Sequence, residues 1–202
     1  MFVQVIQGRV SDSSAIRAHL DKWLAEVAPG ASGWLGSTGG VTKDGQLIAL
    51  VRFESEEAAQ ANSERAEQSA WWEGMAPLFD GEPTFHNSTS VLVDTPGDPS
   101  QATFVQVMQG RTSDPTRAAE LMGTGSDDMA AARPDVLGSV YLSHEEDGWT
   151  MGIYFTSEAE AREGEAKEMP PEMAAIMEEL NGLSIGEPTF FDLKNPWLDS
   201  AS

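Results

Sequence analysis

Apolar and polar residues alternate over residues 2–9, where Phe, Val and Ile are interspersed with Gln. This period of two predicts a β-strand. The period then changes, because apolar residues recur at helical spacing from Ile16 to Val27 and give one apolar face. Ser11–Ser14 offer N-cap residues for this helix, and Pro29-Gly30 ends it.

The next part of the chain is predicted to contain two strands, a second helix and a last strand, at 34–42, 46–54, 55 to about 72 or 75, and 83–93. Lys43-Asp44-Gly45 joins the two strands, and Asp-Gly is a strong hairpin signal. The order of elements is therefore β-α-β-β-α-β, the ferredoxin-like arrangement.

The same pattern occurs twice in the 202 residues. Residues 2–12 recur at 104–114 with nine of eleven positions identical, and Gly81–Phe85 recurs at 186–190. Collinear matches of this kind indicate a tandem duplication. We expect a first repeat, a linker rich in Pro, Gly and Asp, and a second repeat, at 1–94, 95–102 and 103–202.

The duplication has a physical rationale. A four-stranded sheet with helices on one face leaves its other face bare, and two copies can cover both bare faces by packing them together. The predicted fold class is α+β, with two tandem ferredoxin-like βαββαβ repeats forming one intramolecular dimeric α+β barrel. In the second repeat, Asp114-Pro115 predicts a helix start and Asp147-Gly148 a hairpin.

The acidic composition disfavours some classes of binding partner. The chain has 33 Asp and Glu against 12 Lys and Arg, a formal charge of −21 that repels nucleic acids and anionic membranes. The absence of cysteine and three well-separated histidines give no metal-ligand spacing, so no metal is expected. Met1–Gln7 has a strand pattern and not that of a signal peptide, and no apolar run is long enough for a membrane span. We therefore expect a cytoplasmic protein.

Several segments resemble one superfamily. They are Gln7-Gly8-Arg9 at the end of the first strand, Phe53–Ala59, the helix Asn62–Trp72 and the repeated Gly-Glu-Pro-Thr-Phe. The chain resembles the dimeric α+β barrel superfamily over its whole length, and more narrowly its antibiotic-biosynthesis-monooxygenase-like (ABM-like) group. This superfamily includes cofactor-independent oxygenases, haem-degrading enzymes, isomerases and decarboxylases, so the resemblance implies a fold more than a function.

Gln4 and Gln106 are the first candidate ligand contacts. Strand alternation separates Val3 and Val5 from Gln4, and the branched valines suit packing under the helices. Gln4 is therefore predicted to point into the barrel, with Gln106 as its mate. The alternative is that the two glutamines bond to backbone or to each other.

Trp71 and Trp72 end the second predicted helix, where the second repeat has Ile176 and Met177. The resemblance implies that a tryptophan at this helix end walls a pocket. The alternative is one core aromatic and one exposed one. Asn62 on the same helix is a further candidate for substrate contact.

His86 and Arg52 are the candidate catalytic residues. A cavity histidine is a general base near neutral pH, and the alternative is a structural histidine. Arg52 and its counterpart Tyr154 would hold an anionic or phenolic ligand if both point inward, and otherwise Arg52 extends to the barrel rim. His19 and His144 are expected at the surface.

Three functional hypotheses remain open. The first is a cofactor-independent oxygenase acting on a small aromatic or polyketide-like molecule, which needs a pocket, a base and donors to an enolate. The second is a non-catalytic small-molecule-binding or stress-related protein. The third is a barrel filled by its own side chains. No cofactor is expected, because no histidine follows Trp71 or Trp72 as haem degradation within the superfamily requires. The built-in partner predicts a monomer (a pseudo-dimer) or a weak homodimer.

Overall fold

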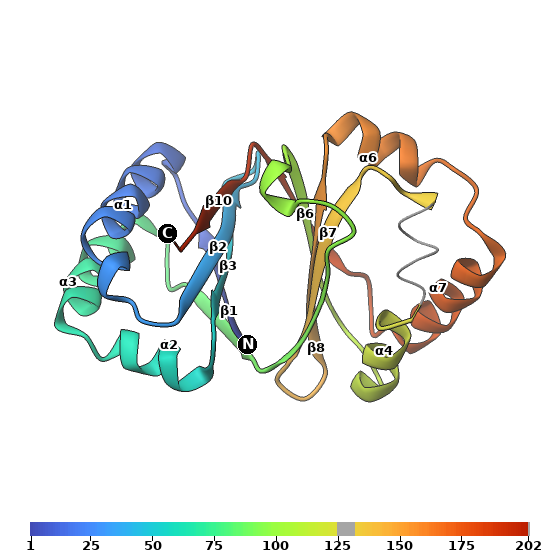
Figure 1. Ribbon diagram of the computed structural model, residues 1–202, viewed down its shortest axis with the longest axis horizontal. Helices are drawn as coiled ribbons and strands as arrows, with labels where there is room; N and C mark the ends of the chain where they lie inside the picture. Colours follow the sequence, from blue (N-terminus) through green and yellow to red (C-terminus); the bar gives the residue numbers. More distant parts are fainter. Residues whose placement is uncertain (125–131, 202) are drawn as a thin grey trace. The chain divides into compact units, whose positions relative to one another are not determined.

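A computed structural model describes residues 1–124 and 132–201 and divides into two compact units (Figure 1). The first unit holds Met1–Thr89 and the segment from Trp197 onward, and the second holds Ser90–Pro196. Each unit is one five-stranded antiparallel sheet with helices on one face (Figure 1). The predicted duplicated ferredoxin-like α+β fold is confirmed. The predicted packing of one sheet against the other stays a prediction.

The first unit follows the predicted element order. Its elements are β1 (Phe2–Arg9), α1 (Ser13–Glu26), β2 (Trp34–Val41), β3 (Gln46–Phe53), α2 (Glu56–Ser63), α3 (Ala66–Met75), β4 (Thr84–Ser88) and β10 (Trp197–Ser200). Asp12 is the N-cap of α1, because its side chain accepts hydrogen bonds from the backbone N–H groups of Ser14 and Ala15.

The second predicted helix is two helices. The chain leaves helical geometry at Arg65, whose φ and ψ are −72° and 138°. The hydroxyl of Ser63 donates to the carbonyl of Gln60, a local bond that competes with helix continuation. The guanidinium of Arg65 donates to the carbonyl of Val27 and to Asn62 Oδ1, each at 3.0 Å. The hydrogen bonds of Arg65 therefore link the α2–α3 junction to the end of α1.

The second unit repeats the arrangement. Its elements are β5 (Ser90–Asp94), β6 (Phe104–Arg111), α4 (Pro115–Met122), β7 (Val136–His144), β8 (Gly148–Phe155), α6 (Glu158–Glu165), α7 (Pro171–Leu183) and β9 (Thr189–Lys194). The predicted start of α4 is confirmed, with Asp114 as N-cap and Pro115 in the first turn.

Each sheet gains its fifth strand from the other sequence repeat. The strand orders are β10-β2-β3-β1-β4 and β5-β7-β8-β6-β9. The predicted strand 83–93 is therefore two strands, β4 and β5, which belong to different sheets. In the same way, β10 follows β9 along the chain but pairs with β2, from Trp197 opposite Gly39 to Ser200 opposite Gly36. The bounds of the compact units therefore differ from those of the sequence repeats.

The side chains of β1 divide into two faces, and the prediction of which one meets the helices was wrong. Phe2 packs with Trp23 of α1, and Ile6 packs in the cluster of Ile16 and Met75. Gln4 shares this helix-facing side, so Val3 and Val5 lie on the opposite one. Each set has two large apolar residues beside polar ones, so alternation alone does not assign the sets to faces. None of the described helices is long and apolar enough to cross a membrane.

Candidate ligand pocket of the first unit

A cavity of about 350 Å³ lies between the helices and the sheet of the first unit. We call it the first pocket. Its walls come from β1, β2, β3, α1, α2 and α3, and also from β10. The volume lies within the range of small-molecule sites, near its lower end.

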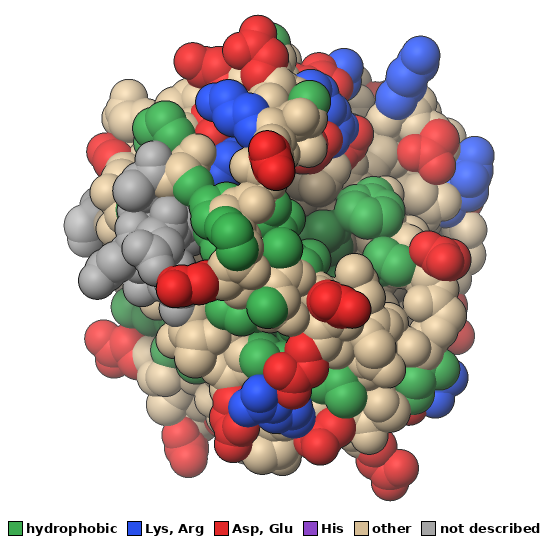
Figure 2. Space-filling view, turned by 90° about the vertical axis from the view of Figure 1, so that its right-hand side faces the viewer, with side chains coloured by type: hydrophobic (Ala, Val, Ile, Leu, Met, Phe, Trp, Pro, Cys, Tyr) green, Lys and Arg blue, Asp and Glu red, His purple; other side chains and the backbone are tan. Residues whose placement is uncertain are grey.

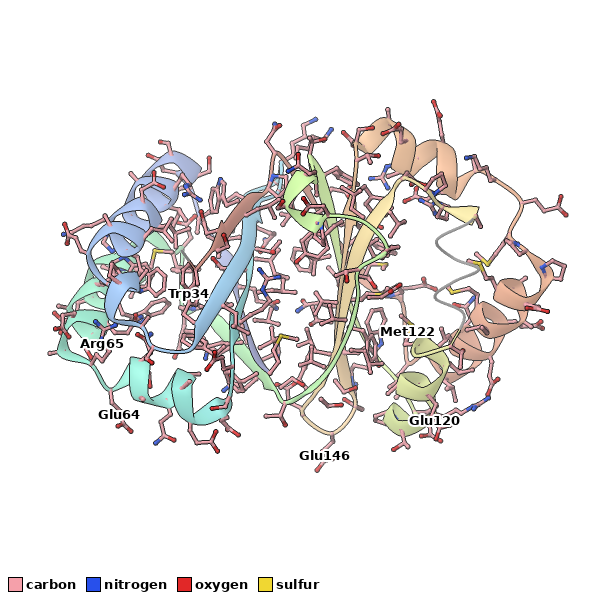
Figure 3. The ribbon with its side chains drawn as sticks, in the orientation of Figure 1. Trp34, Glu64, Arg65, Glu120, Met122 and Glu146 are labelled. Atoms are coloured by element: carbon pink, nitrogen blue, oxygen red, sulfur yellow. The ribbon has the colours of Figure 1, made fainter. Side chains whose placement is uncertain are left out.

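Four indole rings form a continuous aromatic wall in this pocket, which we call the indole wall. Trp34 and Trp23 meet edge to face with centroids 4.9 Å apart. Trp71 follows at 6.3 Å from Trp23, and Trp72 at 6.0 Å from Trp71. Figure 3 shows Trp34 in the space between the helices and the sheet. Rings at these spacings contact one another, and all four also line the pocket.

Amide side chains supply the polar part of the lining. Gln68 Oε1 accepts from Trp23 Nε1 at 2.7 Å and from Asn62 Nδ2 at 3.1 Å. Asn62 is buried, with 7% of its surface exposed, and its Oδ1 accepts from Arg65. On the sheet side, Gln4 Nε2 donates to Asn87 Oδ1 at 3.0 Å. These contacts fix the amides in place.

The Nε1–H of Trp34 is different. It is buried and has no hydrogen-bond partner among the residues that the structure describes. A buried donor without a partner is costly, and most such groups in proteins are paired with protein or water. Trp34 is 7% exposed and lines the pocket, and its Nε1 atom is itself closed to solvent, so a ligand oxygen reaches this donor only after a shift of the neighbouring side chains.

The strand β10 closes one side of the pocket through Trp197 and Asp199. Arg17 of α1 holds both: its guanidinium donates to Asp199 at 3.0 and 3.1 Å and lies 5.8 Å from the ring of Trp197. Burial of Arg17 lowers its pKa, but the carboxylates of Asp199 and Asp21 outweigh burial and the net pKa is raised. The ion pair therefore fixes β10 on the first unit.

Gly36 permits this docking. Its φ is +143°, and a Cβ there would lie 2.6 Å from the carbonyl oxygen of Asp199. The prediction from sequence missed Trp197 and Asp199 as pocket residues. The available signal was the repeat itself, because with the offset of 105 residues Leu198-Asp199 corresponds to Val93-Asp94.

The structure brings four of the eight predicted site residues into the first pocket: Gln4, Asn62, Trp71 and Trp72. Their role in substrate binding stays a prediction. Arg52 and His86 are not in its lining. They lie opposite Val3 and Val5 in register and therefore share the sheet face away from the helices. Gln106 and Tyr154 belong to the second unit.

The two residues of the second unit have separate surroundings. Gln106 is buried and donates to Asp192 Oδ1 at 2.9 Å, and Asp192 is paired with Arg162 at 2.5 Å. Tyr154 is 4% exposed and lies opposite Val105, on the face of its sheet away from the helices. Gln106 thus donates to a carboxylate side chain, whereas the predicted alternative named the backbone or the other glutamine as its partner.

Two histidines expected at the surface are not there. His19 is half-buried and stacks on Trp71 with centroids 5.2 Å apart. Its Nε2 lies 2.9 Å from the carbonyl oxygen of Trp71, whose Nε1 donates to the His19 carbonyl at 2.9 Å. His144 is 7% exposed, with Nε2 2.9 Å from Thr150 Oγ1 and Nδ1 against the Glu145 carboxylate. Partners for the ring nitrogens explain both burials.

No family model matches the sequence, and no curated protein does. Solved structures do match. A candidate monooxygenase from Lactobacillus acidophilus NCFM has a TM-score of 0.74 at 12% identity, covering 98% of this chain and 95% of its own. An anthrone oxidase-like protein has a TM-score of 0.69 at 12% identity, covering 99% and 93%.

A third similar structure comes from Listeria monocytogenes 4b F2365, an uncharacterised ferredoxin-fold protein related to antibiotic biosynthesis monooxygenases. Its TM-score is 0.50 at 9% identity, and the match covers 100% of this chain and 95% of that one. Identities this low establish the fold and leave the chemistry open. By its fold, the chain is similar over its whole length to these proteins, two of which are described as a monooxygenase candidate and as a relative of antibiotic biosynthesis monooxygenases.

Proposed function

We propose that the first pocket binds a planar aromatic molecule with a carbonyl or phenol oxygen and oxidises it with dioxygen, without a cofactor. The observation that carries this proposal is the buried Nε1–H of Trp34, a donor without a partner among the described residues, at one end of the indole wall. The indole wall supplies stacking surface, and the donor supplies one directed hydrogen bond to the ligand oxygen.

The same donor supports chemistry. A hydrogen bond to the ligand oxygen strengthens when that oxygen becomes an enolate or phenolate, so it favours loss of the substrate proton. The deprotonated ring then supplies the electrons. For an anthrone, the CH₂ carbon takes one oxygen atom of O₂ as a carbonyl, and the second oxygen leaves as water with the two hydrogens. An anthrone oxidase-like protein shares the fold, which makes anthrone a suitable first substrate.

One observation favours the alternative, a small-molecule-binding or stress-related protein without turnover. No imidazole or guanidinium lines the first pocket within the described ranges, and its charged groups there are the carboxylates of Glu56 and Asp199. Asp199 is paired with Arg17, which leaves Glu56 as the group that can take a proton. A pocket whose available base is a carboxylate favours substrates that are already acidic.

The test combines anthraquinone binding and anthrone oxidation in air by the full chain and by Trp34→Phe. Losing one buried donor is expected to weaken binding about tenfold. Turnover is expected to fall by about 100-fold, as for the loss of an oxyanion donor. Trp72→Phe is the control, since it shortens the same wall without removing the unpartnered donor, and we expect less than about threefold change.

Each outcome separates the hypotheses. Binding that weakens in Trp34→Phe, with no anthrone oxidation above the buffer rate, supports the non-catalytic alternative. Equal effects of Trp34→Phe and Trp72→Phe contradict the role of the donor. The absence of both binding and turnover with the native chain overturns the proposed substrate class.

A further inference from the structure

The second unit has its own cavity at the equivalent place, between α4, α7 and the helix-facing side of its sheet. Its volume is about 810 Å³, larger than that of the first pocket. We call it the second pocket. Figure 2 shows hydrophobic side chains gathered around a hollow on this face of the molecule. The volume lies in the upper part of the range for small-molecule sites.

The lining positions correspond between the two repeats, but the residue types differ. With the offset of 102 residues, Leu20 corresponds to Met122 and Ala49 to Met151, and β-sheet register gives the same equivalence for Gly39 and Tyr141. With the offset of 105, Trp72 corresponds to Met177. In the indole wall, Trp72 is replaced by Met177, Trp71 by Ile176 and Trp34 by Val136. The lining of the second pocket contains five methionines: Met108, Met122, Met151, Met173 and Met177.

The charges of the second pocket select against anions. Among the described residues of its lining, the only charged side chain is Glu187, and there is no Lys, Arg or His. The chain as a whole carries a formal charge of −21. A carboxylate or phosphate would enter without a counter-ion and against this field. The occupant is therefore neutral at the end that enters the pocket.

The methionine side chains of the lining favour a flexible occupant. A methionine side chain is unbranched and polarizable, and it adapts to guests that lack a rigid outline. The exposed ring of Phe190 (54%) and side chain of Met177 (39%) also belong to this lining. Large apolar side chains left in water beside a cavity mark a binding site for apolar molecules. A flexible aliphatic chain fits this lining better than a planar ring.

The lining also contains neutral polar side chains: Thr112, Thr124, Tyr141, Asn181 and Ser184. Tyr141 is 5% exposed and stacks on Trp149 with centroids 6.4 Å apart. Burial raises the pKa of its hydroxyl, which the neighbouring Ser143 hydroxyl partly opposes. A neutral Tyr141 hydroxyl both donates and accepts, so it is complementary to an alcohol.

We propose that the second pocket binds a neutral, single-chain lipid alcohol, of the long-chain or isoprenoid type. This inference is independent of the function proposed for the first pocket, because it rests on different residues of a different unit. The duplication has then produced two pockets of different chemistry in one chain.

The test is displacement of the neutral fluorescent probe N-phenyl-1-naphthylamine from the full chain by 1-dodecanol, with dodecanoate as the anionic comparison. Dodecanol is expected to displace the probe, and dodecanoate at least about tenfold less well, because its charge has no partner in the lining. Met177→Glu places a charge at the exposed edge of the lining, where folding tolerates it, and should weaken dodecanol binding about tenfold.

Met169→Glu is the matched control, because Met169 is an equally exposed methionine (42%) outside this lining. It should leave dodecanol binding unchanged. Equal weakening by both variants, preference for dodecanoate, or loss of binding in Trp72→Ala of the first pocket instead would overturn the proposal. So would a second copy of the chain as occupant, seen as a dimer that dodecanol does not dissociate.

Discussion

A chain that ends at Pro196 is expected to lose the first pocket and much of the stability of the first unit. Deleting residues 197–202 removes β10, the ring of Trp197 and the carboxylate that pairs with Arg17. It also leaves the edge of β2 unpaired from Gly36 to Gly39. A lost aromatic contact and a lost charged hydrogen-bond pair together cost about 3 kcal/mol of unfolding free energy.

For a unit of this size, that loss lowers the melting temperature of the first unit by about 10 °C or more. Differential scanning calorimetry measures it, and anthraquinone titration shows whether the pocket persists. Deleting only residues 201–202 is the control, because β10 ends at Ser200. Asp199→Asn keeps the strand and removes the charge, so it should lower the melting temperature by an amount between those of the two deletions. A truncated chain that melts and binds like the native one would show that β10 does not hold the pocket.

The second large effect is expected for Trp71→Ala. Trp71 joins α3 to α1, because it stacks on His19, meets Trp23 edge to face and donates its Nε1–H to the His19 carbonyl. Removing a large aromatic side chain from such a site costs about 3–4 kcal/mol. Trp71→Phe retains most of the ring surface and loses the hydrogen bond, so it should cost only about 1 kcal/mol.

Urea denaturation of the two variants measures both values. Because Trp71 also belongs to the indole wall, Trp71→Ala should weaken anthraquinone binding in the fraction that stays folded. His19→Ala tests the coupling, since the combined variant should lose less than the sum of the two single losses. Additive losses of stability, or a cost below about 1 kcal/mol for Trp71→Ala, would show that Trp71 does not join α3 to α1.

The sequence predicted the fold well where local rules act alone. The duplication, the strands of β1 to β3 and the helix start at Asp12 follow from repeated residues, two-residue alternation and capping. The division of the predicted strand 83–93 at Thr89 could not be predicted from the sequence, because the residue pattern does not change between β4 and β5. Which sheet a strand joins depends on contacts distant in sequence, and local pattern does not contain them.

The candidate site was predicted in part for the same reason. Asn62, Trp71 and Trp72 lie on elements whose helix-facing side is clear from periodicity. The side of the sheet that Gln4 occupies was assigned wrongly, because each face of β1 has two large apolar residues and alternation does not show which face meets the helices. Trp34 looked like an ordinary strand residue, since an unpartnered indole N–H becomes visible only once its surroundings are known.

The most direct test of the central claim is a crystal structure of the full chain grown with anthraquinone, a planar carbonyl compound that is not oxidised further. We expect the anthraquinone rings to lie against the indole wall of the first pocket, with one carbonyl oxygen within hydrogen-bond distance of Trp34 Nε1. Anthraquinone bound instead on the sheet face that carries Arg52 and His86, or a first pocket closed by its own side chains at saturating ligand, would contradict the claim.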